Sequence, residues 1–283
     1  MNFDTVASIN VDGRLISFDT PKVMGIVNVT PDSFYAGSRV SERADISDRV
    51  RSMLAEGADI LDIGGYSSRP GADEVSPGEE YSRLARGLEA IRKVKEDVVV
   101  SVDTFRADVA RRCVEEWNVG IINDIAGGDL DPEMWDTVAD LDVPYVLMHM
   151  RGNPKTMGSL TEYKDVTAET LSALAEKTAL LREKGVRDVV IDPGFGFAKT
   201  VEQNYQLLSD LKEFKIIGAP VLVGISRKTM IWKPLEITPD KAANGTTVLN
   251  TIALLNGADI LRVHDVRNAV EAIKLVSQLP TAE

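Results

Sequence analysis

The chain has 283 residues, of which 44% are hydrophobic and 27% are charged, and its 44 acidic and 32 basic side chains give a net charge of −12. This composition is typical of a globular protein with a full apolar core, and the negative charge makes nucleic acid or an anionic membrane an unsuitable partner. The length suits one large domain of about 250 residues with a short extension.

Several features indicate the compartment. Cys113 is the only cysteine, so no internal disulfide forms, which suits a reducing cytoplasm. The first four residues, MNFD, contain no basic stretch that leads into an apolar run, so we expect no signal peptide. No apolar stretch approaches the roughly 20 residues that a membrane helix needs. The sequence therefore predicts a cytoplasmic protein.

The first predicted element is a β-hairpin. Two alternating runs, residues 6–11 and 14–18, flank Asp12-Gly13, which is a favoured two-residue turn. We expect residues 1–20 to form this hairpin and to pack on one end of a domain formed by residues 21–283.

After the hairpin, short apolar runs alternate with helical patterns eight times. Continuous apolar runs are typical of parallel strands that are covered on both faces. The expected strands are residues 23–29, 60–63, 98–102, 121–124, 145–148, 189–192, 221–224 and 260–263. Two of the intervening helices show a shared apolar face, formed by Ile46, Val50, Met53 and Leu54 in one and by Val109, Cys113, Val114 and Trp117 in the other.

A helix start is expected at Ser76, with Ser76 as the N-cap, Pro77 in the first turn and Glu79 completing a capping box. A faint internal repeat marks the helix ends, because the sequence GADIL at residues 57–61 reappears at residues 257–261.

Gly120 and Gly185 begin looser copies of this repeat. Each of the four glycines is expected just beyond the C-terminus of a helix, with a strand following it. Eight such βα units predict a closed (β/α)₈ TIM barrel, and the alternative is an open doubly wound sheet.

Polar residues stand where the predicted strands end, and in a barrel these ends form the active-site mouth. Asp192 is the clearest case, because it follows the apolar run 189–191 and precedes Pro193 and two glycines that let a ligand approach the backbone. The other strand-end residues are Asn28, Asp62, Asp103, Asn123, His149, Arg227, Lys228, Arg262 and His264.

Each of these residues alone has an ordinary structural explanation: Asp103 is placed to cap a helix, Asp192 to form an Asx-turn and His264 to cap beside Asp265. Together they join acids and amides to bases around one mouth. Carboxylates and amides suit a flat heterocycle rich in N–H donors, while Arg262 and His264, as two cations on the same side, suit phosphate oxygens. The sequence thus predicts a ligand with two different ends.

Two segments rich in Gly, Pro and Ser, residues 30–34 and 64–71, are expected to be mobile loops at this mouth. Arg69 is expected to be the functional charged residue of the second loop. His149 fits a substrate contact or a buried hydrogen bond equally well. The sequence shows no zinc-binding spacing, no trusted Ser-His-Asp pattern and no Walker or dinucleotide motif.

From residue 24 to about residue 270, the chain carries a series of motifs in a known order. They are MGIVNVTPDSF at 24–34, SVDT at 101–104, INDI at 122–125, LMHM at 147–150 with GNP at 152–154, DPGFGF at 192–197, GISRK at 224–228 and RVHDV at 262–266. On these motifs, the chain resembles the dihydropteroate synthase family of pterin-binding barrels, which is the target of sulfonamides.

The resemblance implies that 4-aminobenzoate displaces diphosphate from a dihydropterin methyl diphosphate to give dihydropteroate, with Mg²⁺, in a homodimer. It assigns the pterin ring to Asp103, Asn123, Asp192 and Lys228, magnesium to Asn28, and the diphosphate to Arg262 and His264. It assigns the second mobile loop to Ser68 and Arg69, and the aminobenzoate pocket to Phe197, Pro70 and Thr229. The catalytic set implied is Asp103, Asp192, Lys228 and Arg69.

The chain departs from the family pattern in its loops. Tyr66 and Ser68 replace the usual Glu and Thr of the second loop, residues 35–38 read YAGS in place of Ser-Asp-Gly-Gly, and Thr229 stands where Ser is common. Two rival functions remain open here. A pterin-binding methyltransferase-type barrel would have no use for Arg69 or for residues 226–228, and a non-catalytic pterin-binding relative should have lost Asn28, Arg69 or Lys228.

Overall fold

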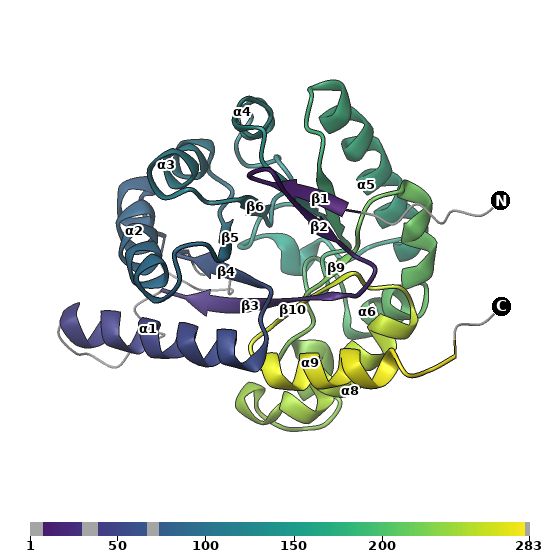
Figure 1. The fold of residues 1–283 in the computed structure, drawn as a ribbon. Coiled ribbons are helices and arrows are strands. Elements are labelled where there is room, and N and C mark those ends of the chain that lie inside the picture. Colours follow the sequence, from purple (N-terminus) through teal and green to yellow (C-terminus); the bar gives the residue numbers. More distant parts are fainter. Residues whose placement is uncertain (1–7, 30–38, 67–73, 281–283) are drawn as a thin grey trace.

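Eight parallel strands form a nearly closed barrel surrounded by helices, as predicted (Figure 1). The structure, a computed structural model, describes residues 8–29, 39–66 and 74–280, and only the backbone for residues 39–44. The order of the strands in the sheet is β8-β7-β6-β5-β4-β3-β10-β9. The strands are β3 (Lys22–Asn28), β4 (Ile60–Gly64), β5 (Val99–Asp103), β6 (Ile121–Asp124), β7 (Tyr145–Met148), β8 (Val189–Asp192), β9 (Leu222–Val223) and β10 (Ile260–Val263).

The two outer strands of this sheet meet and bring the barrel close to full closure. Ile191 in β8 forms a parallel bridge with Val221, just before β9, and its backbone N–H donates to the carbonyl of Pro220 at 2.9 Å. All eight carboxyl ends therefore lie at the same mouth, which is the condition that the proposed convergence of site residues requires.

The helices follow the strands around the outside of the barrel. They are α1 (Arg39–Glu56), α2 (Pro77–Val94), α3 (Ala107–Trp117), α4 (Met134–Leu141), α5 (Val166–Glu183), α6 (Val201–Ser209), α7 (Thr229–Trp232), α8 (Ala243–Leu255) and α9 (Val266–Val276). The expected apolar faces are confirmed, because Ile46, Val50 and Met53 in α1 and Val109 and Cys113 in α3 are buried. Within the described ranges, no helix combines the length and the apolar character needed to cross a bilayer.

The predicted hairpin is confirmed as β1 (Ser8–Val11) and β2 (Arg14–Ser17), which pair antiparallel. Asp12 and Gly13 at its tip have φ values of 48° and 74°, and this suits a tight hairpin turn. Figure 1 shows the hairpin, in purple, lying across the barrel. Its buried side chains pack against one residue from every barrel strand, namely Met24, Ile60, Val99, Ile121, Val146, Val190, Leu222 and Ile260.

These contacts lie near the amino ends of the strands. The hairpin therefore closes the amino end of the barrel, and the carboxyl mouth remains as the place for a ligand.

One predicted helix cap is only half correct. Ser76 does cap α2, because its hydroxyl accepts the N–H of Glu79 at 3.2 Å. The carboxylate of Glu79 does not complete the expected capping box and instead binds Nε of Arg83 at 2.9 Å, since an arginine four residues later offers a charge-assisted partner on the same helix face. A complete capping box forms at α6 between Thr200 and Gln203.

Three of the four repeat glycines end helices as expected: Gly57, Gly185 and Gly257 follow α1, α5 and α8 with φ values of 103°, 97° and 90°. For Gly120 the expectation is wrong, because Asn118 takes the left-handed position after α3, with φ of 52°. A Cβ at Gly120 would lie 2.3 Å from Cγ1 of Val11, so this glycine serves the close approach of the hairpin to the barrel.

Replacing Gly120 with Ala should destabilise the fold by about 1–3 kcal/mol, because the added methyl group must push the hairpin away from its layer. Chemical denaturation measures this free energy of unfolding. Gly78→Ala is the matched control, since a Cβ there meets nothing within 4 Å. Equal stability of the two variants would contradict this account of how the hairpin seals the barrel.

Candidate active site at the carboxyl mouth

Hydrogen bonding between adjacent strands places three of the predicted site residues in one row. Asn28 at the end of β3 pairs in register with Gly64 of β4, Gly64 pairs with Asp103 of β5, and Asp103 pairs with Asn123 of β6. Residues paired in this way lie at the same height along the barrel. A Cβ at Gly64 would lie 3.5 Å from Cβ of Asp103, so the glycine leaves room between the polar residues.

The centre of the site is the guanidinium of Arg262 in β10. Its Nε donates to Oδ2 of Asp62 at 2.6 Å, and its Nη2 donates to Oδ2 of Asp103 at 2.6 Å. Asn123 donates from Nδ2 to the same Oδ2 of Asp62 at 3.2 Å. One cation from β10 thus holds carboxylates from two other strands.

Burial governs the charge of this cluster. It raises the pKa of Asp103 to about 7, Arg262 opposes the rise, and Asp62 adds to it. For Arg262, burial disfavours the charge, but the two carboxylates outweigh it and raise the pKa of the guanidinium. The second oxygen of Asp62, Oδ1, is buried and has no hydrogen-bond partner among the described residues, so within this part of the chain the cluster holds an acceptor for a further donor.

A second group of site residues surrounds Gly224. A Cβ at this glycine would lie 3.9 Å from each of Cβ of Arg262, Oδ2 of Asp192 and Nζ of Lys228, so these three side chains meet at one place. Lys228 donates to the carbonyl of Phe195 at 2.5 Å and lies 4.6 Å from the ring centre of Phe197. The acids, amides and bases predicted from the strand ends therefore converge on a single region.

Asp192 and Lys228 shift each other's ionisation. Burial raises the pKa of Asp192, and Lys228 opposes this rise. Burial lowers the pKa of Lys228 to about 8, and Asp192 opposes the fall. One oxygen of Asp192 already accepts the N–H of Gly194 at 2.7 Å, and this bond orients the carboxylate.

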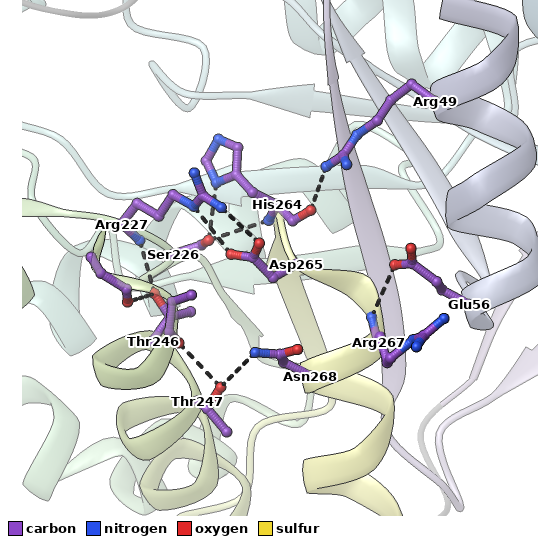
Figure 2. Close-up of polar contacts among 12 residues, drawn as sticks. Arg49, Glu56, Ser226, Arg227, Thr246, Thr247, His264, Asp265, Arg267 and Asn268 are labelled. Carbon is purple, nitrogen blue, oxygen red and sulfur yellow. Dashed lines mark hydrogen bonds and ion pairs between the residues drawn. The ribbon is translucent and has the colours of Figure 1, made fainter. Parts of the chain in front are cut away.

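His264 lies beside Ser226 in a polar network (Figure 2). The hydroxyl oxygen of Ser226 lies 2.9 Å from Nδ1 of His264 and accepts the backbone N–H of His264 at 3.2 Å. Burial lowers the pKa of His264 to about 4, with Arg262 adding to the effect. The imidazole is therefore neutral near pH 7 when no anion is bound, and it is an N–H donor close to Arg262. The expectation that the two residues act as a pair of cations on a phosphate stays a prediction.

Arg227 is held apart from the substrate-facing cluster. Its guanidinium binds both carboxylate oxygens of Asp265, at 3.1 and 2.7 Å, as Figure 2 shows. Its backbone has a φ of 58°, and its N–H donates to the hydroxyl of Thr246 at 3.1 Å. Asp265 is thus a partner of Arg227. Arg227 serves to hold the segment that carries Lys228.

Of the two possibilities for His149, the structure shows the buried hydrogen bond. Its Nδ1 lies 3.0 Å from Nζ of Lys199, and burial lowers the pKa of His149 to about 2. Lys199 was not selected from the sequence, because a lysine after a loop usually lies in solvent. Asp62 was noted only as a strand end, since its pairing with Arg262 joins residues 200 positions apart.

The remaining predicted residues fall into two groups. Thr229 is exposed at the first position of α7, directly after Lys228. Ser68, Arg69 and Pro70 lie outside the described residues, as does the first loop.

Tyr66, one of the departures from the family pattern, packs edge-on against Phe105, with ring centres 5.2 Å apart.

Replacing Arg262 with Met should destabilise the protein in a pH-dependent way. The folded-state pKa of Asp103 already lies above its unfolded value near 4, so its contribution to stability falls as the pH rises from about 4 to about 7 and is level above that. Without the guanidinium this pKa rises further. The extra loss of unfolding free energy should therefore be small near pH 5, begin near pH 7 and grow by about 1.4 kcal/mol for each further pH unit, to about 1–2 kcal/mol at pH 8.

Unfolding in denaturant at several pH values measures this difference. Arg187→Met is the control, because its ion pair with Asp142 is largely exposed and is worth about 1 kcal/mol or less. If the unfolding free energy that Arg262→Met loses is the same at every pH, the raised pKa of Asp103 is contradicted.

Comparison with known proteins gives a consistent result. Residues 24–264 match the family described as pterin binding enzymes. A dihydropteroate synthase from Synechocystis sp. is 42% identical over 260 residues, which is 91% of this chain and 89% of the relative. The dihydropteroate synthase of Xanthomonas albilineans, solved with 4-aminobenzoic acid, superposes with a TM-score of 0.89 at 38% identity, covering 98% of this chain and 100% of that one. The Yersinia pestis enzyme, solved with a sulfonamide drug, gives 0.88 at 37% identity, covering 95% and 98%.

Proposed function

The chain belongs to the dihydropteroate synthases, the transferases that join a dihydropterin methyl diphosphate to 4-aminobenzoate, and we propose that the cluster at its carboxyl mouth performs this reaction. The observation that carries the proposal is the convergence of Asp103, Asn123 and Asp192 with Lys228 and Arg262 on one region. This arrangement brings acceptors and cations together in one region, where they can serve a ligand that has N–H groups at one end and a diphosphate at the other.

The acceptor end suits the pterin ring. Asp103 and Asn123 stand in register on neighbouring strands, and Asp192 projects from β8 with Oδ1 already oriented by Gly194. A pterin presents an amidine-like edge whose N–H groups pair with a carboxylate through two hydrogen bonds. We assign these two hydrogen bonds to Asp192. Asp103 and Asn123 would bind the other polar atoms on the edge of the ring.

Substrate binding requires Arg262 to change partners. In the structure its guanidinium is hydrogen-bonded to the carboxylates of Asp62 and Asp103. These carboxylates are among the acceptors that a pterin would use. A ring that takes over hydrogen bonds to Asp103 frees one side of the guanidinium for an anion. Arg262 and the neutral N–H donor His264 then hold the diphosphate.

The chemistry follows from this division of charge. As the C–O bond to diphosphate breaks, Arg262 and Lys228 stabilise the negative charge that develops on the leaving group. Asp103 and Asp192 stabilise the pterin cation that remains. The amine of 4-aminobenzoate then attacks the pterin methylene carbon. No strong base is required, because an aryl amine is already neutral at pH 7.

We also propose that Mg²⁺ takes part. The ion is usually held by a few protein oxygens together with substrate phosphates, and Asn28 offers one amide oxygen in the same row as Asp103. When bound, Mg²⁺ neutralises charge on the leaving group.

For the aminobenzoate pocket we propose Phe197, Thr229 and Pro70 as lining residues, with Ser68 and Arg69 on the second loop, which would close over the reacting centre. Phe197 lies over Nζ of Lys228, and Thr229 follows Lys228 in the chain, so both are next to the reacting end of the pterin site. Sulfonamides resemble 4-aminobenzoate in shape and charge, and this pocket is where they would compete with it.

We further propose that the enzyme is a cytoplasmic homodimer. Three large apolar side chains, Val248 and Leu255 on α8 and Leu275 on α9, are 50%, 58% and 71% exposed, which suits coverage by a second copy. Cys113, the only cysteine, is a buried free thiol, as expected in a reducing compartment.

Replacing Asp192 with Ala tests the assignment of the pterin grip. The variant should lose about 2–5 kcal/mol of transition-state stabilisation, because two N–H groups of the ring lose their charged acceptor. The measurement is kcat/KM from a coupled assay of diphosphate release that requires both 4-aminobenzoate and Mg²⁺.

Asp188→Ala, at the other end of the same β-strand region, is the control and should retain activity. Near-normal activity of Asp192→Ala would remove this residue from its role. Diphosphate release by the wild type that needs no 4-aminobenzoate would contradict the proposed reaction itself.

A further inference from the structure

The loop between β8 and α6 has an unusual backbone. Gly194, Gly196 and Ala198 all have positive φ values, of 73°, 78° and 49°. Two of these positions are glycines, but Ala198 adopts a conformation that side chains normally avoid. The loop carries Phe197 and follows directly after Asp192. A backbone held in this form needs strong contacts from the surrounding structure.

Several of these contacts come from Lys199, which is only 8% exposed. Its ammonium donates to the carbonyl oxygens of Gly194 at 3.2 Å and Phe197 at 3.1 Å, and it lies 3.0 Å from Nδ1 of His149. A further contact of 3.5 Å joins Nζ to the backbone carbonyl oxygen of His149, so each N–H group of the lysine has an acceptor within reach. Lys199 thus holds both ends of the loop without a carboxylate in direct contact.

A second lysine holds the same loop from the substrate side. The carbonyl of Phe195 accepts a hydrogen bond from Lys228 at 2.5 Å, while the carbonyls of Gly194 and Phe197 accept from Lys199. The loop is therefore clamped between two ammonium groups. Lys228 lies beside Asp192 and Arg262 at Gly224, whereas Lys199 contacts His149.

We propose that Lys199 is a positioning residue for the reaction, which acts through the backbone of residues 194–197 on the Phe197 ring and the Asp192 carboxylate. This inference rests on the proposed function, in which Phe197 lines the aminobenzoate pocket and Asp192 grips the pterin. Lys199 itself touches neither substrate. Its hydrogen bonds fix the directions of the backbone carbonyl groups in the turn that follows Asp192. They also hold in place the carbonyl of Phe195, which accepts the hydrogen bond from Lys228.

Lys199 is close to its titration point near pH 7, and it keeps enough N–H groups in either charge state to donate to both loop carbonyls. Burial lowers its pKa to about 7, with Asp192 opposing the fall and Lys228 and Arg151 adding to it. An ammonium is expensive to bury, so three well-placed acceptors are needed to keep it in the protein. The loop supplies two of these acceptors and His149 supplies the third.

Lys199→Met tests the inference, because it keeps the length of the side chain and removes all its donors. The folded variant should show a KM for 4-aminobenzoate at least tenfold above that of the wild type. A residue of general stability would instead lower kcat per mole of total protein and leave KM unchanged. Circular dichroism and thermal unfolding establish how much of each variant is folded.

Lys215→Met is the matched control, since the ammonium of Lys215 binds Asp259 at the opposite end of the barrel. Its KM for 4-aminobenzoate and its KM for the pterin substrate should both stay within twofold of the wild type. Lys199→Gln is a conservative variant that retains two N–H donors, and its KM should fall between those of the wild type and Lys199→Met.

Two outcomes overturn the inference. One is that Lys199→Met and Lys199→Gln both fold with KM values within twofold of the wild type. The other is that neither variant folds, which would make Lys199 a residue of general stability. Wild-type protein assayed in parallel separates these results from a failure of the proposed function, because that failure would abolish aminobenzoate-dependent diphosphate release in every sample.

Discussion

The site depends on one interaction, the sharing of the Arg262 guanidinium between the carboxylates of Asp62 and Asp103. Each of these charges would be costly to bury alone, and together they form a stable cluster inside the mouth of the barrel. The fold makes the sharing possible, because β10 lies two strands from β4 and three from β5 in the closed sheet. The same cluster leaves acceptors that a ligand with N–H groups can use, so the stability of the empty site and its recognition of substrate have a common origin.

Much of the fold was predictable from local patterns in the sequence. All eight strands were expected, because parallel strands covered on both faces leave continuous apolar runs, and the hairpin was expected from Asp12-Gly13 between alternating runs. The errors concern contacts that the helix and strand patterns do not report, one of them between distant segments and one within a helix. Gly120 is required by Val11 of the hairpin, more than 100 positions away, and no local pattern reports such an approach. Glu79 was misassigned because Arg83 competes for its carboxylate.

The candidate site was predictable to a similar degree. Asp103, Asn123 and Asp192 stand at strand ends, and the topology of the barrel alone brings such positions together. Charge states and partners were not accessible in this way. The neutral state of His264 follows from its burial beside Arg262, and the role of Lys199 follows from carbonyl directions in a loop with three positive φ values. Both depend on the three-dimensional surroundings, which the spacing of residues along the chain does not encode.

The exchange of partners by Arg262 is the central claim, and calorimetric titration of two substrate fragments tests it most directly. The fragments are a hydroxymethylpterin without phosphate and inorganic diphosphate with Mg²⁺. If the ring releases Arg262 from Asp103, saturating pterin should tighten diphosphate binding, by roughly 5–150-fold for a coupling of the usual size, and diphosphate should tighten pterin binding by the same factor. Competition between the fragments, or diphosphate affinity that does not change when pterin is bound, would contradict the account.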